Sequence, residues 1–248
     1  MAIVITGGTK GIGLAIAARL ARPGESLVLG YHRDDDAAQA AAARFSLIGA
    51  KVTTVKADVG TIDGASDLMA HVAALGQGVA ALVHSAAMIY PTTLLGADLE
   101  TFTRAVQTNG LSLLYLVQSA LPLMDRGSSV VFISSAGARQ AQASYGALGA
   151  GKALAESILR YLVPELAPRG IRINAVAPGL VETTSVATML GSEEAAARLF
   201  ERAGKANPSG RLTEDADYAS LVEYLVSPEA QFIQGQVIHA NGGAYVGG

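Results

Sequence analysis

A tyrosine and a lysine seven residues apart form the most chemically suggestive pair in the sequence. Tyr145 and Lys152 are joined by a run of glycine, alanine and leucine. On an α-helix, positions i and i+7 lie about 20° apart, so both side chains would share one face, one turn further apart than an i, i+4 pair. An ammonium group near a phenol favours the phenolate and can make the pair a proton donor. The same residues also fit an ordinary exposed helix, so the rest of the chain must decide.

A glycine-rich turn after the first apolar run is the second chemical signal. Glycines without a β-carbon let backbone amides approach a pyrophosphate at a helix N-terminus, where the dipole favours anions. A tight turn without a ligand is the alternative, but the position between a strand and an amphipathic helix favours a nucleotide. The residues expected at this site are Gly7, Thr9, Lys10, Gly11, Ile12 and Gly13.

The end of the second apolar run indicates which nicotinamide cofactor fits. An acidic residue there would accept a ribose 2′-hydroxyl and repel a 2′-phosphate. Here the run ends in His32 and Arg33, with no carboxylate before Asp34. Lys10 and Arg33 offer two cations, and arginine can grip a phosphate in a fork. We therefore expect NADPH (NADP+), and interpret residues 34–36 as the cap of the next helix.

Short β-branched runs alternate with longer segments rich in alanine and leucine. Continuous apolar strands indicate a parallel sheet that is buried on both faces. The alternation predicts an α/β fold, a single doubly wound (Rossmann-type) domain of about seven strands with helices on both faces. The expected strands are Ala2–Thr6, Leu27–Leu29, Val52–Val55, Ala80–Val83, Val130–Ser134, Arg172–Val176 and Gln236–His239. The expected helices are Ile12–Ala21, Asp36–Leu47, Ile62–Leu75, Leu99–Leu123, Ser144–Leu166 and Glu214–Val226.

Composition narrows the function. The 248 residues suit one domain (residues 1–248), and a net charge of −3 with 16% charged residues argues against a nucleic-acid or anionic-membrane binder. There is no cysteine, which excludes disulfides and zinc–thiolate sites, and no metal site is expected. The first residues enter an apolar strand without the basic start of a signal peptide, and no apolar run reaches membrane-spanning length. We expect a cytoplasmic protein.

One irregular segment interrupts the alternation. Pro178–Pro208 contains Gly179, Gly191 and Gly204 around a short charged helix near Glu193–Arg202. A long insertion with its own helix is more often a functional lid than a passive loop. The apolar residues expected to cover a substrate are Val186, Met189, Leu190, Leu199 and Phe200, with packing or subunit contact as the alternative.

Taken in order, these motifs resemble those of the short-chain dehydrogenase/reductases over nearly the whole chain. The glycine-rich turn, Asp58-Val59 after the third strand, Ser134-Ser135 at the end of the fifth and the Pro178–Thr183 turn all match. The resemblance implies that Asp58 and Val59 contact the adenine. It further implies that the nicotinamide lies against Pro178, Gly179, Val181 and Thr183.

Two departures from the family pattern stand near the predicted cofactor. The fourth strand ends in His84-Ser-Ala-Ala87 where the family usually has Asn-Asn-Ala-Gly, and Asn241 replaces the aspartate of a C-terminal Asp-Gly-Gly. We interpret His84 as a packed strand-end histidine rather than a catalytic base. Ser85, Ala86 and Ala87 remain expected cofactor contacts.

The spacing around Tyr145 resembles one branch of the family, enoyl-acyl-carrier-protein reductase III. Most members have a lysine four residues after the tyrosine and a serine about a dozen residues before it. Here Gly149 occupies the position of that lysine, and Ser135 lies ten residues before Tyr145. The resemblance implies an NADPH-dependent reductase that adds hydride to the β-carbon of an enoyl thioester on a carrier protein or coenzyme A. It also implies a homotetramer, because family members pair their long helices across subunits.

The implied roles follow from this reading. Tyr145 would donate to the enolate oxygen, and Lys152 would bind the cofactor ribose and tune the phenol. Ser135 would face the substrate, and Asn109 would hold a proton-relay water or simply be a buried helix residue. Two alternatives stay open: a ketoreductase, which would call for lysine rather than Gly149, and a non-catalytic dinucleotide-binding protein.

Overall fold

A parallel sheet forms the centre of the protein in the computed structural model, which describes residues 1–247. Within this range the sheet has seven strands in the order β3-β2-β1-β4-β5-β6-β7. The strands are β1 (Ala2–Thr6), β2 (Ser26–Tyr31), β3 (Lys51–Lys56), β4 (Val79–His84), β5 (Met124–Ile133), β6 (Arg172–Pro178) and β7 (Val237–Ala240). The chain reverses its winding between β1 and β4, and ligands bind outside the carboxyl ends of strands at such a switch point. The predicted doubly wound fold is confirmed.

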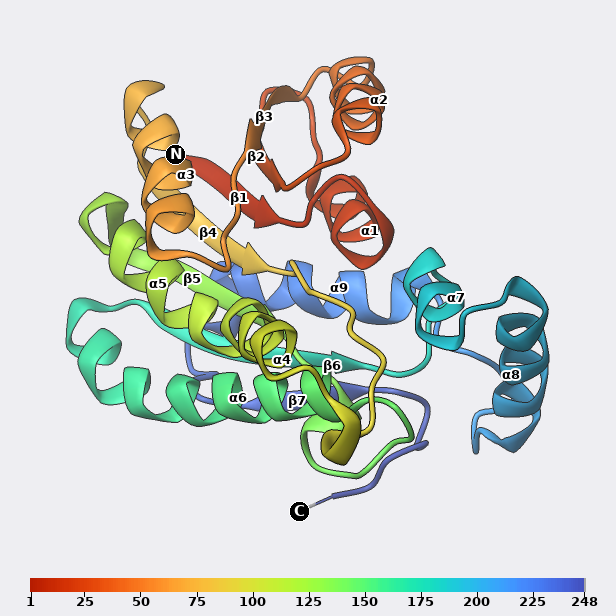
Figure 1. Cartoon of the computed structure of the whole chain (residues 1–248). Helices are drawn as coiled ribbons and strands as arrows, with labels where there is room; N and C mark the ends of the chain where they lie inside the picture. Colours follow the sequence, from red (N-terminus) through yellow and green to blue (C-terminus); the bar gives the residue numbers. More distant parts are fainter. Residues whose placement is uncertain (248) are drawn as a thin grey trace.

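Helices cover both faces of this sheet (Figure 1). Helices α3, α5 and α6 pack apolar side chains against one face, and α1, α2 and α9 pack against the other. The α-helices are α1 (Gly11–Leu20), α2 (Asp35–Ser46), α3 (Ile62–Ala74), α4 (Leu99–Val106), α5 (Ser112–Ala120), α6 (Gly146–Leu166), α7 (Thr184–Leu190), α8 (Glu193–Ala206) and α9 (Asp215–Val226). Shorter helical segments are η1 (Leu94–Gly96), η2 (Gln107–Leu111), η3 (Leu121–Leu123), η4 (Ala136–Ala138), η5 (Ala167–Arg169) and η6 (Pro228–Ala230).

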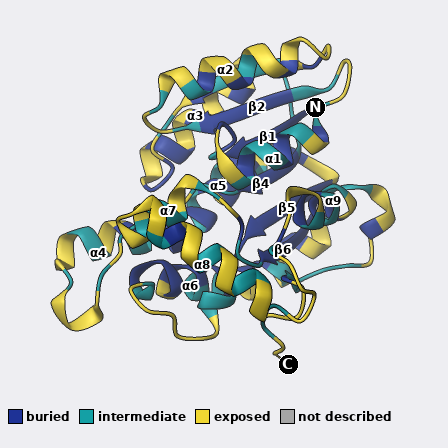
Figure 2. Cartoon of the chain, turned by 90° about the vertical axis from the view of Figure 1, so that its right-hand side faces the viewer, coloured by how far each residue is buried: buried dark blue, intermediate teal, exposed yellow. Residues whose placement is uncertain are grey.

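Strands β1 and β6 are buried along their whole length, which explains their continuous apolar sequences. Every residue of β1 and β6 is buried, and Figure 2 shows the strands as the dark interior between partly exposed helices. Complete burial of a Val, Leu or Ile side chain stabilises the fold by about 1.5–3 kcal/mol. The sheet is therefore a rigid platform for residues that follow its carboxyl ends.

The predicted helix over Leu99–Leu123 is divided in the structure. Between α4 and α5 the segment η2 forms a π-helical turn that contains buried Asn109 and Gly110. A β-carbon on Gly110 would lie 2.8 Å from the carbonyl oxygen of Gly151 in α6, so the two helices approach closely at this point. The irregular turn places Asn109 against α6 beside the predicted active site.

The Pro178–Pro208 segment contains two helices rather than the one that was expected. Both α7 and α8 lie beyond the carboxyl ends of the strands (Figure 1), and their described residues are mostly exposed, with Ala196 the buried residue of α8. The C-terminal end of this segment is held by Asn207, whose side chain donates to the Asn241 carbonyl at 3.0 Å. None of the helices within residues 1–247 combines the length and hydropathy that a membrane-crossing helix needs.

Candidate active site

The turn between β1 and α1 has the backbone geometry of a phosphate site. Gly7 and Gly11 have φ values of +64° and +48°, a region that glycine enters without strain. A β-carbon on Gly13 would lie 2.2 Å from the Gly7 carbonyl oxygen, so only glycine lets α1 begin this close to β1. No side chain at the N-cap position, Lys10, accepts from the first amides of α1, and the Lys10 ammonium pairs with Asp34. Those amides are therefore available to an anion.

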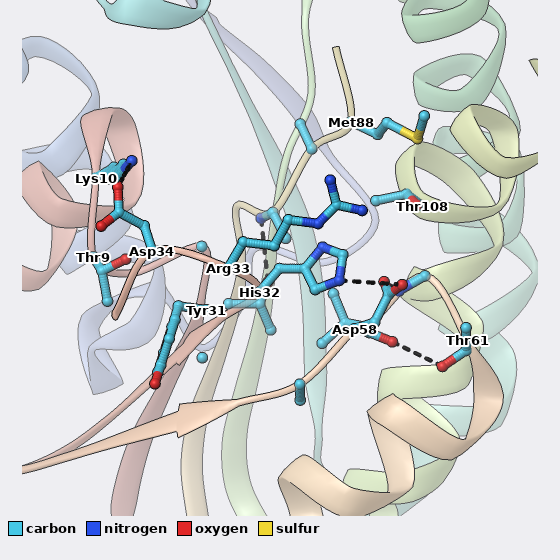
Figure 3. A pocket seen from close by; sticks show the side chains of 18 of the residues that line it. Thr9, Lys10, Tyr31, His32, Arg33, Asp34, Asp58, Thr61, Met88 and Thr108 are labelled. Carbon is cyan, nitrogen blue, oxygen red and sulfur yellow. Dashed lines mark hydrogen bonds and ion pairs between the residues drawn. The ribbon is translucent and has the colours of Figure 1, made fainter. Parts of the chain in front are cut away.

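A cavity of about 530 Å³ lies at the carboxyl ends of β1 to β4 (Figure 3). Its volume is within the usual range of small-molecule sites. The predicted cofactor residues that line it are Gly7, Thr9, Lys10, His32, Arg33, Asp58, Val59, Ala86 and Ala87. The other predicted cofactor residues belong to the first turn of α1, to Ser85 and to the segments around Tyr145 and Pro178–Thr183, and they do not line this cavity.

One ion pair and one histidine–carboxylate contact lie inside this cavity. Lys10 pairs with Asp34, and the hydrogen bond from Lys10 lowers the pKa of the Asp34 carboxyl. The Asp34 side chain also accepts from the Ala37 amide, so the residue caps α2 as the sequence suggested. His32 Nε2 lies 3.6 Å from an Asp58 oxygen. Arg33 extends into the middle of the cavity in Figure 3.

Tyr145 and Ser135 meet at the opposite end of the site. The Tyr145 hydroxyl donates to Ser135 Oγ at 3.1 Å, and that oxygen also accepts from the Gly137 amide at 3.1 Å. Burial raises the pKa of the Tyr145 phenol, and the hydrogen bond to Ser135 offsets only part of this rise. The expectation that Lys152 lowers this pKa is not what the structure gives. A neutral phenol is instead a hydrogen-bond donor over the physiological pH range.

Lys152 lies in α6, whereas Tyr145 is the N-cap residue of that helix. Its Nζ donates to the Ile133 carbonyl at 2.7 Å and lies 4.5 Å from the centre of the Phe132 ring. The side chain is almost completely buried, and this desolvation lowers the pKa of the ammonium to about 7. The lysine is thus held at the end of β5, the strand that leads to Ser135.

Two glycines determine how the Ser135–Tyr145 loop rests on α6. A β-carbon on Gly149 would lie 2.5 Å from the Gly137 carbonyl oxygen, and one on Gly137 would lie 2.4 Å from the Tyr145 ring. The Gly137 peptide therefore fills the space between the phenol and position 149. A side chain at position 149, the place of the usual family lysine, would require the loop to move.

A buried carboxylate fixes the same loop from the other side. Glu156 accepts from Ser134 Oγ at 2.6 Å and from Arg139 Nε at 3.0 Å. Glu156 follows Lys152 by one turn of α6, so a single helix carries the lysine and the anchor of the loop. Neither Glu156 nor Arg139 was indicated by the sequence, because a helix carboxylate and a loop arginine are ordinary surface residues in a sequence pattern.

The Asn109 side chain forms hydrogen bonds with the backbone of the segment that follows β4. Its Oδ1 accepts from the Met88 amide and its Nδ2 donates to the Met88 carbonyl, both at 2.9 Å. Gly151 makes this arrangement possible, because a β-carbon there would lie 2.6 Å from the Asn109 β-carbon. The observed contacts hold the β4–α4 connection; a role toward a relay water stays a prediction.

His84 is a packed histidine, as the sequence suggested. Ser112 Oγ donates to the Thr108 carbonyl at 2.6 Å, so it accepts from His84 Nε2 at 2.7 Å. His84 Nδ1 then accepts from Thr6 Oγ1 at 2.7 Å, and Thr6 Oγ1 accepts from the Ala86 amide at 3.2 Å. Burial, with a smaller contribution from the charge of Lys152, lowers the pKa of His84 to about 3. The imidazole is neutral and links β1, β4 and α5 in place of the family asparagine.

The Pro178–Thr183 turn reaches the glycine-rich turn. Thr183 is the N-cap residue of α7, and its Cγ2 would lie 3.6 Å from a β-carbon on Gly11. Val181, in the same turn, is buried. The predicted nicotinamide residues therefore come next to the predicted phosphate residues, as a dinucleotide requires.

Comparisons with known proteins identify the group to which this geometry belongs. A family model described as Enoyl-(Acyl carrier protein) reductase matches residues 7–245. A solved short chain dehydrogenase from Burkholderia cenocepacia J2315 in complex with NADP has a TM-score of 0.86 and 27% identity, with 97% of this chain and 96% of that chain covered. The chain belongs to the short-chain dehydrogenase/reductase family.

Relatives within the family differ in their reactions. The 1-cyclohexenylcarbonyl-CoA reductase of Streptomyces collinus is 32% identical, covering 97% of this chain and 85% of that protein. The 3-oxoacyl-[acyl-carrier-protein] reductase FabG of Staphylococcus epidermidis is 30% identical, covering 98% of each chain. The solved enoyl-[acyl-carrier-protein] reductase (NADH) of Aquifex aeolicus VF5 has a TM-score of 0.87 and 27% identity over 99% of this chain and 97% of that one. Family membership makes this chain an oxidoreductase, and its own side chains must indicate the substrate.

Proposed function

We propose that this short-chain dehydrogenase/reductase uses NADPH to transfer hydride to the β-carbon of an enoyl thioester. The observation that carries the proposal is the arrangement around Tyr145. The neutral phenol meets Ser135, its lysine partner lies seven residues away, and the Gly137 carbonyl closes position 149. The resemblance of this spacing to enoyl reductases and the description of the matching family model support the same reading.

The residues present fit NADPH as the cofactor. A β-carbon on Gly7 would lie 2.9 Å from the Ala86 backbone, so the turn is shaped for close backbone approach. The free first amides of α1 suit a pyrophosphate, and Arg33 suits a 2′-phosphate. NADPH supplies the hydride when bound. Lys152 would hold the nicotinamide ribose, and Thr183 and the Val181 backbone would hold the carboxamide.

Conjugate reduction places negative charge far from the carbon that accepts the hydride. Hydride adds to the β-carbon, and the electrons of the carbon–carbon double bond move to the thioester oxygen, three bonds away. The Tyr145 hydroxyl would exchange its Ser135 acceptor for this oxygen and stabilise the enolate by hydrogen bonding. The α-carbon then takes a proton, the thioester carbonyl re-forms, and the saturated thioester leaves.

The acyl chain would lie beneath the Pro178–Pro208 segment. Val186, Met189 and Phe200 are partly exposed on α7 and α8, which suits a surface that is covered only when substrate is present. Leu190 and Leu199 complete this predicted set. The thioester would be carried by coenzyme A or by a carrier protein.

Ketoreduction is the second candidate, because the FabG relative is similar over almost the full length of both chains. In that reaction the hydride and proton go to adjacent atoms, carbon and oxygen. The family then uses a lysine four residues after the tyrosine, a position that Gly149 occupies here.

One experiment separates these candidates. The purified protein is given NADPH with a short trans-2-enoyl-CoA or with the 3-ketoacyl-CoA of the same chain length, and NADPH consumption is followed. We expect turnover with the enoyl thioester. Rapid reduction of the 3-ketoacyl thioester without enoyl turnover would make the protein a ketoreductase, and tight NADPH binding with neither activity would favour a non-catalytic role.

A further inference from the structure

Each carboxylate that lines the 530 Å³ cavity has a basic partner. Asp34 is compensated by Lys10. Asp58 has His32 at 3.6 Å. Both carboxylates that line the cavity thus have a basic neighbour, and Lys10 is already engaged before any ligand arrives.

Two arginines remain in the cavity after this pairing. Arg33 follows β2, and Arg104 lies in α4. Both are exposed, and neither has an ion-pair or hydrogen-bond partner within residues 1–247. Two uncompensated guanidinium groups at one cavity attract an anion, and their planar forks match phosphate oxygens.

Arg33 points toward the wall formed by η2, the turn that follows the helix of Arg104. Thr108 lies four residues after Arg104 and also lines the cavity. Figure 3 shows the Arg33 guanidinium extended toward Thr108. A β-carbon on Gly60 would lie 2.4 Å from Thr108 Oγ1, so this wall is packed directly on the loop of Asp58. Arg104, one turn before Thr108, lines the same cavity as Arg33 but from a different element.

We propose that Arg104 and Arg33 clamp the cofactor 2′-phosphate from two walls of the cavity, with Arg104 as a specificity-determining residue. This inference rests on the proposed NADPH dependence. It adds Arg104 to the pair expected from the sequence, Lys10 and Arg33, because the Lys10 ammonium is already paired with Asp34. The position of Arg104 in a helix, remote from both cofactor motifs, explains why no sequence pattern indicated it.

Binding measurements without substrate test the clamp. The wild type, Arg104→Gln, Arg33→Gln and the double variant are titrated with NADPH, NADH, 2′,5′-ADP and 5′-AMP by calorimetry. Losing a charged hydrogen bond corresponds to about tenfold weaker binding or more. We expect Arg104→Gln to weaken NADPH and 2′,5′-ADP by at least that factor, while NADH and 5′-AMP change less than about twofold. The double variant should bind NADPH no better than NADH.

A matched control removes the same charge elsewhere. Arg160 is exposed on α6, and Arg160→Gln should leave the NADPH preference unchanged. Thermal unfolding of each variant without cofactor checks that the fold is retained. Raising the salt concentration should reduce NADPH affinity more steeply for the wild type than for Arg104→Gln, because the variant has one fewer cation at the phosphate.

The possible results separate the clamp from the proposed function. A wild type that binds NADPH no more tightly than NADH would refute the cofactor assignment itself. A wild type that prefers NADPH, with Arg104→Gln keeping the full preference, would refute the clamp alone. Equal weakening of NADPH and NADH by Arg104→Gln would also refute it, since the arginine would then contact a part that the two cofactors share.

Discussion

Burial shifts the pKa values of the two central side chains in opposite directions. Tyr145 is kept protonated by a raised pKa, whereas the pKa of Lys152 falls to about 7. The phenol can donate a hydrogen bond without first receiving a proton. The pKa of the lysine lies close to physiological pH, so a small change in its environment can change its charge.

Removal of the Tyr145 hydroxyl should affect chemistry rather than cofactor binding. We expect Tyr145→Phe to bind NADPH with unchanged affinity and to reduce an enoyl thioester about 10²–10³-fold more slowly, because one donor to the enolate oxygen is lost. Single-turnover rates and NADPH titrations measure the two effects separately. A variant with near-normal turnover would show that another group stabilises the enolate.

The Lys152 pKa predicts a pH-dependent stability. The folded state binds this proton less tightly than the unfolded state, whose lysine pKa is near 10.5. Between pH 7 and 9 the unfolded state therefore holds more protons, and stability rises with pH. Relative to Lys152→Met, the wild-type free energy of unfolding should increase by about 2 kcal/mol over this interval. Urea unfolding at both pH values measures the difference, and parallel curves for the two proteins would contradict a depressed pKa.

The contact between the Ser135–Tyr145 loop and α6 depends on the absence of a single methyl group. Gly149→Ala places a β-carbon against the Gly137 carbonyl, and overpacking of this kind costs about 1–3 kcal/mol. We expect lower stability and a lower kcat, since the loop carries Ser135 and positions the phenol, whereas NADPH affinity should persist. Thermal unfolding and steady-state kinetics measure these changes.

Gly204 supplies the comparison for that variant. It also lies within a helix, but a β-carbon there would meet its nearest neighbour, Leu212, at 3.6 Å. Gly204→Ala should therefore gain up to about 1 kcal/mol from helix propensity. Equal effects of the two substitutions on stability would mean that the Gly137 carbonyl can move aside at little energetic cost.

Sequence patterns predicted the elements that have repetitive apolar signals and missed those that do not. The strand Ala2–Thr6 has the predicted bounds because all five residues are buried. The first half of β5 was missed because its residues 125–127 are exposed and polar. Helix α7 was missed because none of its residues is buried, which leaves no periodic apolar face.

The site was predictable where motifs are local and unpredictable where contacts are distant. Ser135, Tyr145 and Lys152 were identified from spacing, and the structure places Ser135 against the phenol. Arg104 and Glu156 were missed because their importance depends on which elements the fold brings together. A charged helix residue has no distinguishing sequence pattern until its neighbours are known.

The assembly of subunits is still an expectation from the family resemblance. The structure leaves large apolar side chains exposed on the helices concerned: Leu99 at the start of α4 is 74% exposed and Tyr161 on α6 is 75% exposed. We expect light scattering at micromolar concentration to give a tetramer, or at least a dimer. Tyr161→Glu should shift the protein toward smaller species, and a wild-type monomer would contradict the expectation.

The close approach of Gly137 and Gly149 also restricts which mutations such a protein can accept during evolution. A mutation to lysine at position 149 collides with the Gly137 carbonyl before any new spacing can be used. A protein in which Gly149 becomes lysine and Lys152 is lost would thus be inactive, because the Ser135–Tyr145 loop would be displaced whichever reaction the new spacing could support. An evolutionary path to the four-residue spacing must first lengthen or refold the segment between Ser135 and Tyr145. Insertions in that segment, rather than substitutions in α6, are the changes to seek in intermediates between the two kinds of reductase.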